Sequence, residues 1–161
     1  MYHPFVIANF FIRRADKENI ELTPMKLLKL VYIAHGWYLG FNDNKLINEP
    51  VEAWRYGPVI TSLYYKLKSF GSNQVDALII PPPGEKNEID NKTQEFLGLV
   101  WTAYKKFNAL QLSTLTHLKD TPWAKTDQSY YIDEEVIKKY YKKKIEENKA
   151  AVEKERKKET A

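Results

Sequence analysis

The sequence lacks cysteine altogether, and only six of its 161 residues are glycine. Without cysteine, the chain has no disulfide, no thiolate zinc site and no cysteine nucleophile. It also has no apolar run near the roughly 18 residues of a membrane-spanning helix, and its N-terminus lacks the layout of a secretory signal. These absences fit a reducing compartment, so we expect a cytoplasmic protein without membrane association.

The sequence does contain enough apolar material for one packed domain. Hydrophobic residues make up 43% of the chain and aromatic residues 14%, which favours a folded core over disorder. A chain of 161 residues accommodates one such core. We therefore expect one domain over residues 1–145 and a charged helical C-terminal extension over residues 146–161.

The net charge of +4 is unevenly distributed along the chain. Residues 138–158 carry ten Lys or Arg against four Glu, whereas residues 1–137 carry a net charge of −1. The basic character therefore belongs to the C-terminal segment, which argues against a uniformly basic nucleic-acid-binding surface. A solvated helical face is the usual interpretation of such a segment, and contact with RNA or with an acidic protein stays open as an alternative.

The spacing of apolar residues predicts a mainly α fold, a compact multi-helix domain with a small antiparallel β element and a long basic C-terminal helix. The expected helices cover residues 3–15, 24–39, 59–70, 91–107 and 109–118, and one more begins after Asp133. Thr23 and Asp133 are of the residue types that cap helix starts. Thr121-Pro122 repeats the Thr-Pro signal of residues 23–24, which predicts a further helix start there.

The helix over residues 24–39 has several unusual positions. We expect its apolar residues to face the core, and Lys26 and Lys29 to point away from it. Gly36 lies inside the helix, where glycine costs roughly 1 kcal/mol relative to alanine, and this indicates close approach by another element. Gly40 fits a C-terminal cap. His35 is most simply interpreted as a hydrogen-bonded core histidine.

The periodicity changes between residues 45 and 55. Residues 45–47 and 51–55 alternate between apolar and polar, which predicts two short β segments. Pro50 would place this ribbon at an edge or a turn. The run Tyr56-Gly57-Pro58 is expected to end the ribbon.

No arrangement of residues indicates catalysis. The chain has no nucleophile elbow, phosphate-binding loop or dinucleotide fingerprint. His117 and Asp120 come closest to a metal pair, and one such pair is a weak signal. The carboxylate pair Glu134/Glu135 is better explained by the first turn of a helix. We therefore expect a protein that is not an enzyme and has no catalytic residues, cofactor or metal.

Two segments have the composition of a binding surface. Trp54, Arg55 and Tyr56 form a cluster of the residue types that dominate binding hot spots. Tyr140, Tyr141 and Lys142 place aromatic residues among lysines on the C-terminal helix. The alternative interpretation is that Trp54 and Tyr56 belong to the core and that Arg55 forms an intramolecular ion pair.

Three motifs in order resemble a known family. They are PMKLLKLVYIAHGWYL at residues 24–39, EAWRYGPV at residues 52–59, and LSTLTH at residues 112–117 followed by Pro122-Trp123. Together they are similar to the Panacea or SocA-like antitoxin domain, over roughly residues 3–145. The resemblance implies a predominantly helical fold with a small β element. Its motif residues, which we expect to be structural, are Pro24, Lys26, His35, Gly36, Gly57, Pro58, His117 and Trp123.

The resemblance also implies a function. Such a protein would be a bacterial or phage antitoxin that neutralises a toxin encoded by the adjacent gene, expected here to inhibit translation. Direct protein–protein binding is the expected mechanism, with the antitoxin as a homo-oligomer or as a hetero-oligomer with its toxin. Trp54, Arg55, Tyr56, Tyr140, Tyr141 and Lys142 are the expected toxin contacts.

Two alternatives to direct inhibition remain at this point. The protein would be an adaptor that delivers its toxin to a AAA+ protease, or a regulator that binds nucleic acid through residues 138–158. The additional DNA-binding module of some relatives is not expected in this chain, because the first predicted helix of the family begins near residue 3.

Overall fold

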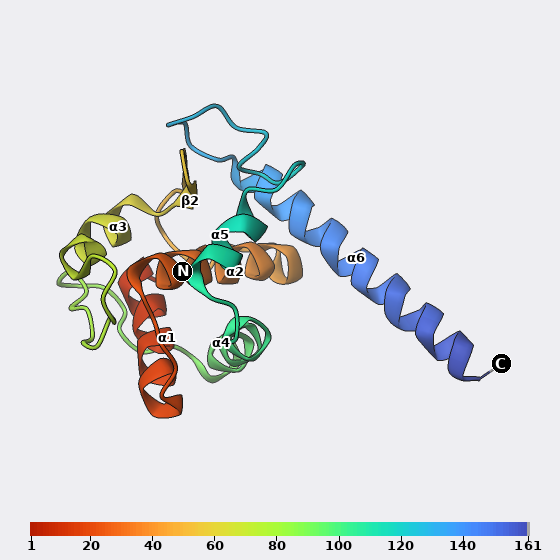
Figure 1. The fold of residues 1–161 in the computed structure, drawn as a ribbon, viewed down its shortest axis with the longest axis horizontal. Helices are drawn as coiled ribbons and strands as arrows, with labels where there is room; N and C mark the ends of the chain where they lie inside the picture. The colour runs from red at the N-terminus through yellow and green to blue at the C-terminus, as the bar shows by residue number, and fades with distance from the viewer. Residues whose placement is uncertain (161) are drawn as a thin grey trace.

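The structure is a computed structural model that describes residues 1–160, and it confirms the mainly α fold (Figure 1). Its small sheet has two antiparallel strands. The elements are α1 (Pro4–Glu18), α2 (Pro24–Asn42), β1 (Glu52–Trp54), β2 (Gly57–Val59), α3 (Thr61–Leu67), the 3-10 helix η1 (Lys68–Phe70), α4 (Asn91–Tyr104), α5 (Ala109–Thr116) and α6 (Glu134–Glu159). None of the helices within residues 1–160 is long and apolar enough to cross a membrane.

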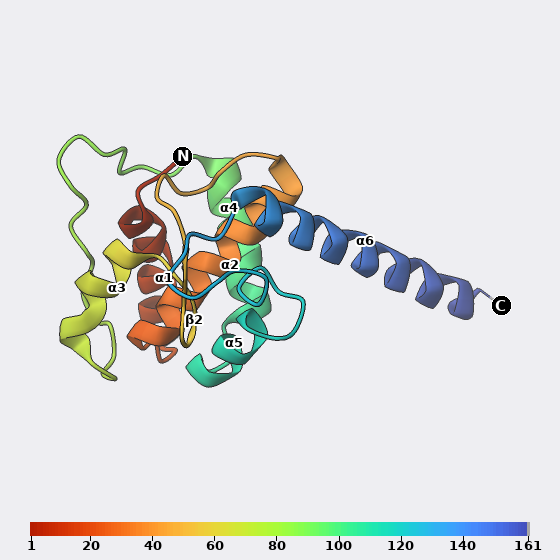
Figure 2. The same ribbon diagram turned by 90° about the horizontal axis from the view of Figure 1, so that it is seen from above.

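Helix α2 is the centre of the fold and has almost no side that faces solvent. It packs against α1, α3, α4, α5, α6 and β2 (Figures 1 and 2). The expectation that Lys26 and Lys29 point away from the core is wrong, because their side chains are only 6% and 3% exposed. A helix covered on every side has no outer face on which a lysine could be placed.

Helix α6 packs closely across α2 at two glycines. A Cβ on Gly36 would overlap the Tyr141 ring, and a Cβ on Gly40 would lie 3.0 Å from Tyr141 Cβ and 3.2 Å from Ile145 Cδ1. The predicted close approach at Gly36 is therefore confirmed. Gly40 is not the C-terminal cap, since α2 continues to Asn42 and Asp43 ends it with a φ of 56°. Gly40 instead makes room for α6.

The β element pairs different segments from those predicted. Residues 45–47 do not form a strand with residues 51–55. Ile47 makes an isolated bridge to Tyr2, and β1 pairs with β2, with Ala53 opposite Pro58. The hairpin turns at Arg55 and Tyr56, and the φ of 118° at Gly57 suits glycine. The run expected to end the ribbon therefore supplies its second strand.

The Thr121-Pro122 signal does not begin a helix, and this prediction is wrong. The chain makes only turns there, with the Lys125 amide 3.2 Å from the Thr121 carbonyl. The following residues instead run along the outer edge of β1, where Ala53 exchanges hydrogen bonds with Ser129 and Tyr130. Pairing with a strand requires an extended backbone, which a helix through this segment would not provide.

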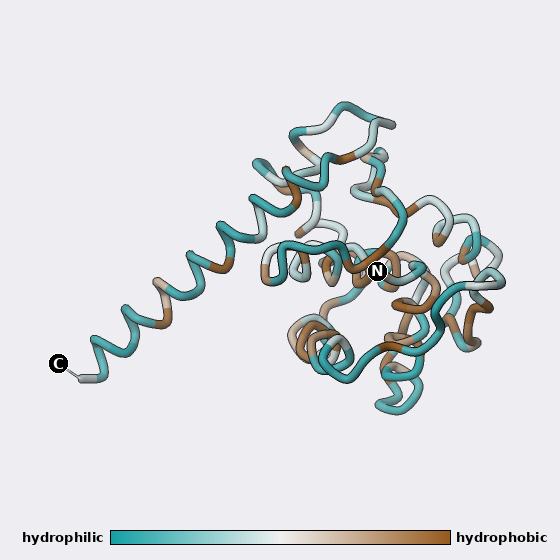
Figure 3. The backbone as a smooth tube through the Cα atoms, turned by 180° about the vertical axis from the view of Figure 1, so that it is seen from behind, coloured by the Kyte–Doolittle hydropathy of each residue, from teal (hydrophilic) through white to brown (hydrophobic). Residues whose placement is uncertain are grey.

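The second half of α6 projects away from the rest of the protein. Ile145 is the last buried residue, and residues 146–160 are all exposed. Figure 1 shows this part of the helix extending into solvent, and Figure 3 shows that it is mostly hydrophilic. The long basic C-terminal helix is therefore confirmed. Its second half has no packing partner within the described residues.

Replacing Gly36 with alanine tests the contact between α2 and α6. Although alanine favours a helix, its methyl group would meet a buried aromatic ring, so Gly36→Ala should lower the free energy of unfolding by about 1–3 kcal/mol. Gly40→Ala, where the contacts are longer, should cost less. Urea denaturation of both variants measures this. Equal or higher stability of Gly36→Ala would contradict the packing described.

Truncation after Ile145 tests how much the projecting helix contributes. Because residues 146–160 bury nothing against the domain, their removal should change the free energy of unfolding by less than about 0.5 kcal/mol. Thermal denaturation and circular dichroism provide the measurement. A loss of several kcal/mol would show that the domain boundary proposed at residue 145 is misplaced.

Candidate functional site

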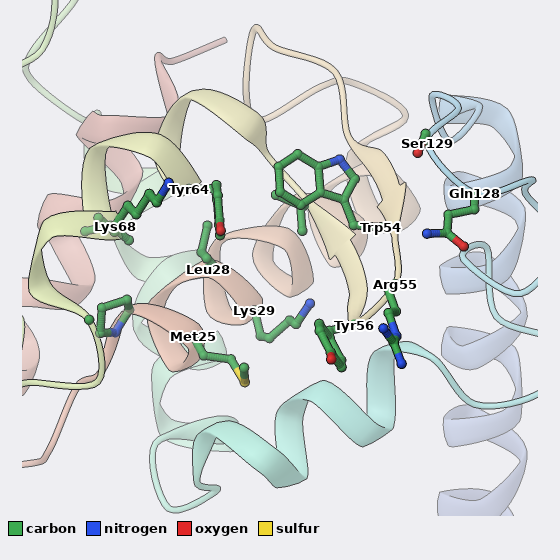
Figure 4. A pocket seen from close by; sticks show the side chains of 14 residues that line it. Met25, Leu28, Lys29, Trp54, Arg55, Tyr56, Tyr64, Lys68, Gln128 and Ser129 are labelled. Carbon is green, nitrogen blue, oxygen red and sulfur yellow. The ribbon is translucent and has the colours of Figure 1, made fainter.

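A pocket of about 570 Å³ lies between the start of α2, the β1–β2 hairpin and α3 (Figure 4). It contains the three hairpin residues that the sequence indicated as a binding surface, Trp54, Arg55 and Tyr56. Its other lining residues are Pro24, Met25, Leu28, Lys29, Val59, Tyr64, Leu67, Lys68, Gly71, Gln128 and Ser129. The volume and the mainly apolar lining are typical of a binding pocket.

Three neighbouring elements hold the hairpin in place. Lys29 of α2 donates a hydrogen bond from Nζ to the Pro58 carbonyl at 3.1 Å. Ser113 of α5 donates its hydroxyl to the Tyr56 carbonyl at 3.1 Å. The Trp123 indole, in the segment before α6, donates to the Trp54 carbonyl at 2.5 Å. The turn therefore has a fixed backbone, while its side chains remain free to contact another molecule.

Lys29 is the unusual residue of this pocket. Its side chain is 3% exposed. Within residues 1–160, no carboxylate oxygen lies within 4.0 Å of Lys29 Nζ, the limit for an ion pair. Burial lowers the pKa of Lys29 from 10.5 to about 8. Gly57 allows this placement, because a Cβ there would lie only 2.7 Å from Lys29 Nζ. The fold thus holds a buried ammonium against a neutral carbonyl.

Aromatic side chains continue from the pocket onto the surface. The Trp54 and Tyr64 ring centres are 4.8 Å apart, and Tyr65 lies 5.3 Å beyond Tyr64. Tyr56 and Tyr65 are 65% and 64% exposed. The Arg55 guanidinium lies 5.5 Å from the centre of the Tyr56 ring. Exposed Tyr, Trp and Arg in one place have the composition of a protein-binding surface.

The three predicted contacts on the C-terminal helix have different positions. Tyr141 is only 6% exposed and lies against Gly36 in the core, so the expectation of a surface residue is wrong for it. Lys142 binds the Asp43 carboxylate at 2.9 Å and links α6 to the end of α2. Tyr140 is half-buried and lines a separate pocket beside α6. Tyr140 and the hairpin residues thus line different pockets.

The residues of the family motifs have identifiable packing positions. Pro24 begins α2, and Lys26 donates to the carbonyl of Lys105 at 2.6 Å, where α4 ends. The His117 ring contacts the Ser113 carbonyl and lies 5.1 Å from Trp123. Lys26 thus joins α2 to the end of α4, and His117 joins the end of α5 to the segment at Trp123. We retain the interpretation that these residues act mainly on the fold.

His35 is the hydrogen-bonded core histidine that the sequence predicts. Its side chain is completely buried, and its Nε2 lies 2.8 Å from a carboxylate oxygen of Glu134 at the start of α6. Its Nδ1 and the neighbouring Tyr32 hydroxyl have no hydrogen-bond partner in the structure. No group of three or more His, Cys, Asp or Glu residues within the described part of the chain could hold a metal ion.

Sequence reasoning found the hairpin but missed most of its pocket. The sequence places Lys29 on the wrong side of α2, and it does not indicate Tyr64 or Lys68 as binding residues. One signal was available, because α2 carries apolar residues on nearly every side between Pro24 and Ala34. A helix of that kind is buried all round, and its lysines are then buried with it.

Comparison with known proteins identifies the family. A family model described as antitoxin SocA-like, Panacea domain, matches residues 27–124. The chain therefore belongs to the SocA-like antitoxin family, and the resemblance noted in the sequence is confirmed. Membership supports an antitoxin role and, at the same coarse level, a toxin as the partner.

A curated relative gives the same indication. The chain is 28% identical over 129 residues to a protein named Antitoxin SocA from Caulobacter vibrioides (strain NA1000 / CB15N). The alignment covers 73% of this chain and 66% of that relative, slightly less than two thirds of its length. No solved structure matched the chain.

Replacing Lys29 with methionine should stabilise the isolated protein. The lowered pKa implies a cost of about 3 kcal/mol for burying the charge, which exceeds the value of one hydrogen bond to a carbonyl. We expect Lys29→Met to raise the free energy of unfolding at pH 7 by about 1–2 kcal/mol, as measured by urea denaturation.

The stability difference should also depend on pH. Below about pH 8 Lys29 is charged in both the folded and the unfolded chain, so the full cost is present. As the pH rises from about 8 to 10.5, the folded protein loses this proton first, and the wild type gains stability relative to Lys29→Met. A constant difference across this range would contradict the burial of a charged amine.

Proposed function

We propose that this protein is an antitoxin that neutralises a toxin by binding it directly through the face formed by the β1–β2 hairpin and α3. The observation that carries the proposal is the cluster of exposed aromatic and basic side chains around a pocket in a chain of the SocA-like antitoxin family. The partner is a toxin encoded by the neighbouring gene, and inhibition of translation is its expected activity.

The geometry of the hairpin supports binding by occlusion. Its backbone is fixed by α2, α5 and the Trp123 segment, so its side chains need little ordering when a partner arrives. Preorganised aromatic residues lose little conformational entropy on binding. Arg55 and Tyr56 project from the turn itself (Figure 4), which makes them the first residues to test.

The test combines growth rescue with measurement of the complex. The neighbouring gene product is expressed with the wild-type chain, with Arg55→Ala/Tyr56→Ala, or with the control Arg13→Ala/Leu99→Ala. The control removes one exposed arginine and one exposed apolar side chain outside the pocket. We expect wild type and control to restore growth, and the hairpin variant to bind at least about tenfold more weakly.

The same experiment separates the proposal from its alternatives. If purified chain and toxin form no complex and growth is not rescued, the antitoxin proposal fails. If the toxin disappears only when a AAA+ protease is present, the chain is an adaptor rather than a direct inhibitor. If rescue depends on residues 138–158 and on nucleic acid in a salt-sensitive manner, the regulator alternative is favoured.

A further inference from the structure

The charged residues that line the hairpin pocket are all basic. Among the described lining residues, Lys29, Arg55 and Lys68 are basic and none is acidic. Lys29 lies at the base of the pocket, on α2, whereas Arg55 and Lys68 are exposed at its rim (Figure 4). The remaining lining is mainly aromatic and aliphatic. Such a pocket is complementary to a ligand that combines apolar groups with a negative charge.

The buried Lys29 side chain donates to the neutral Pro58 carbonyl. An ammonium has further N–H groups that can donate. Burying a charge without an opposite charge is costly, and paired burial is the usual arrangement in proteins. A carboxylate would supply an opposite charge, and Lys29 lines the pocket that a ligand would enter.

Lys26 shows what a structural lysine looks like on the same helix. It is also buried, at 6% exposure, but its Nζ lies 2.6 Å from the Lys105 carbonyl at the end of α4. Burial lowers the pKa of Lys26 as well, but the carbonyls at a helix C-terminus carry partial negative charge and offset part of this cost. Lys29 instead donates to the carbonyl of Pro58, which belongs to strand β2. The two lysines are therefore a matched pair on one helix, and Lys29 is the one that lines the hairpin pocket.

We propose that the hairpin pocket receives an Asp or Glu side chain, flanked by an apolar residue, from an extended segment of the partner protein. Lys29 is the ion-pair partner of that carboxylate. The proposal rests on the proposed function in one respect, namely that the partner is the toxin.

The shape of the pocket favours a segment that passes across it. Tyr64 of α3 and Lys68 of η1 lie on one side, and Gln128 and Ser129 lie on the other (Figure 4). The floor is provided by Met25, Leu28 and Lys29 of α2. An extended segment could enter at one side and leave at the other, with its acidic side chain directed at the floor. Arg55 and Lys68 would attract it electrostatically from the rim.

The first experiment uses Lys29→Met and the matched control Lys26→Met with the neighbouring gene product. Lys29→Met is expected to fold with at least wild-type stability and to bind at least about tenfold more weakly. Lys26→Met, which changes a buried lysine outside the hairpin pocket, should bind like the wild type below its melting temperature. Equal affinity of Lys29→Met and wild type would overturn the inference while leaving the proposed function intact.

Each Asp and Glu of the partner is then changed to Asn or Gln. One of these changes should reproduce the loss of affinity seen with Lys29→Met. When that change is combined with Lys29→Met, the affinity should fall no further. Fully additive effects for every acidic residue would contradict a direct ion pair with Lys29.

A second experiment is independent of the toxin. A phage-displayed peptide library is selected on the full chain and depleted on Lys29→Met. The expected peptides share an Asp or Glu next to an apolar residue, and lose at least about tenfold in affinity for Lys29→Met. Selection of peptides without an acidic residue, or of none that distinguishes the two chains, would overturn the inference. Success here without toxin binding would contradict only the proposed function.

Discussion

The near-complete burial of α2 is the constraint on which the rest of the structure depends. Helices α1, α4, α5 and α6 and the hairpin all pack against it, so each element is positioned relative to one central helix. The two glycines at positions 36 and 40 allow α6 to lie close enough for Tyr141 and Ile145 to enter the core. Tight packing of this kind leaves little tolerance for added volume.

The same burial creates the unusual electrostatics of the candidate site. Two lysines lie within a helix that has no solvent-facing side, and the fold accommodates them differently. Lys26 donates to the Lys105 carbonyl at the end of α4, where partial negative charge offsets part of the cost of its burial. Lys29 lies beneath the hairpin and donates to the neutral Pro58 carbonyl. The buried charge of Lys29, at the base of the candidate pocket, therefore lowers the stability of the free protein, as is common for functional residues.

Much of the fold follows from local patterns in the sequence. The caps at Thr23 and Asp133 and the tight contact at Gly36 are all found where the sequence indicates them. The wrong predictions concern segments whose backbone pairs with residues that are distant in the sequence. Residues 129–130 pair with Ala53, and Ile47 pairs with Tyr2, and neither pairing can be deduced from the local sequence.

The candidate site could be predicted only in part for a similar reason. Trp54, Arg55 and Tyr56 stand out by composition, and they do line the pocket. The pocket also needs α3 and the segment at residues 128–129, which are brought to the hairpin by tertiary packing alone. Tyr141 is of a residue type common in binding surfaces, yet it lies in the core, because the two glycines of α2 leave room for its side chain.

Hydrogen–deuterium exchange of the complex with the neighbouring gene product tests the central claim most directly. The claim is that the partner binds the face made by the start of α2, the hairpin and α3. Binding should slow exchange in residues 24–29, 52–59 and 61–68, and leave residues 146–160 unchanged. Protection confined to α6, with no change at the hairpin, would contradict the account.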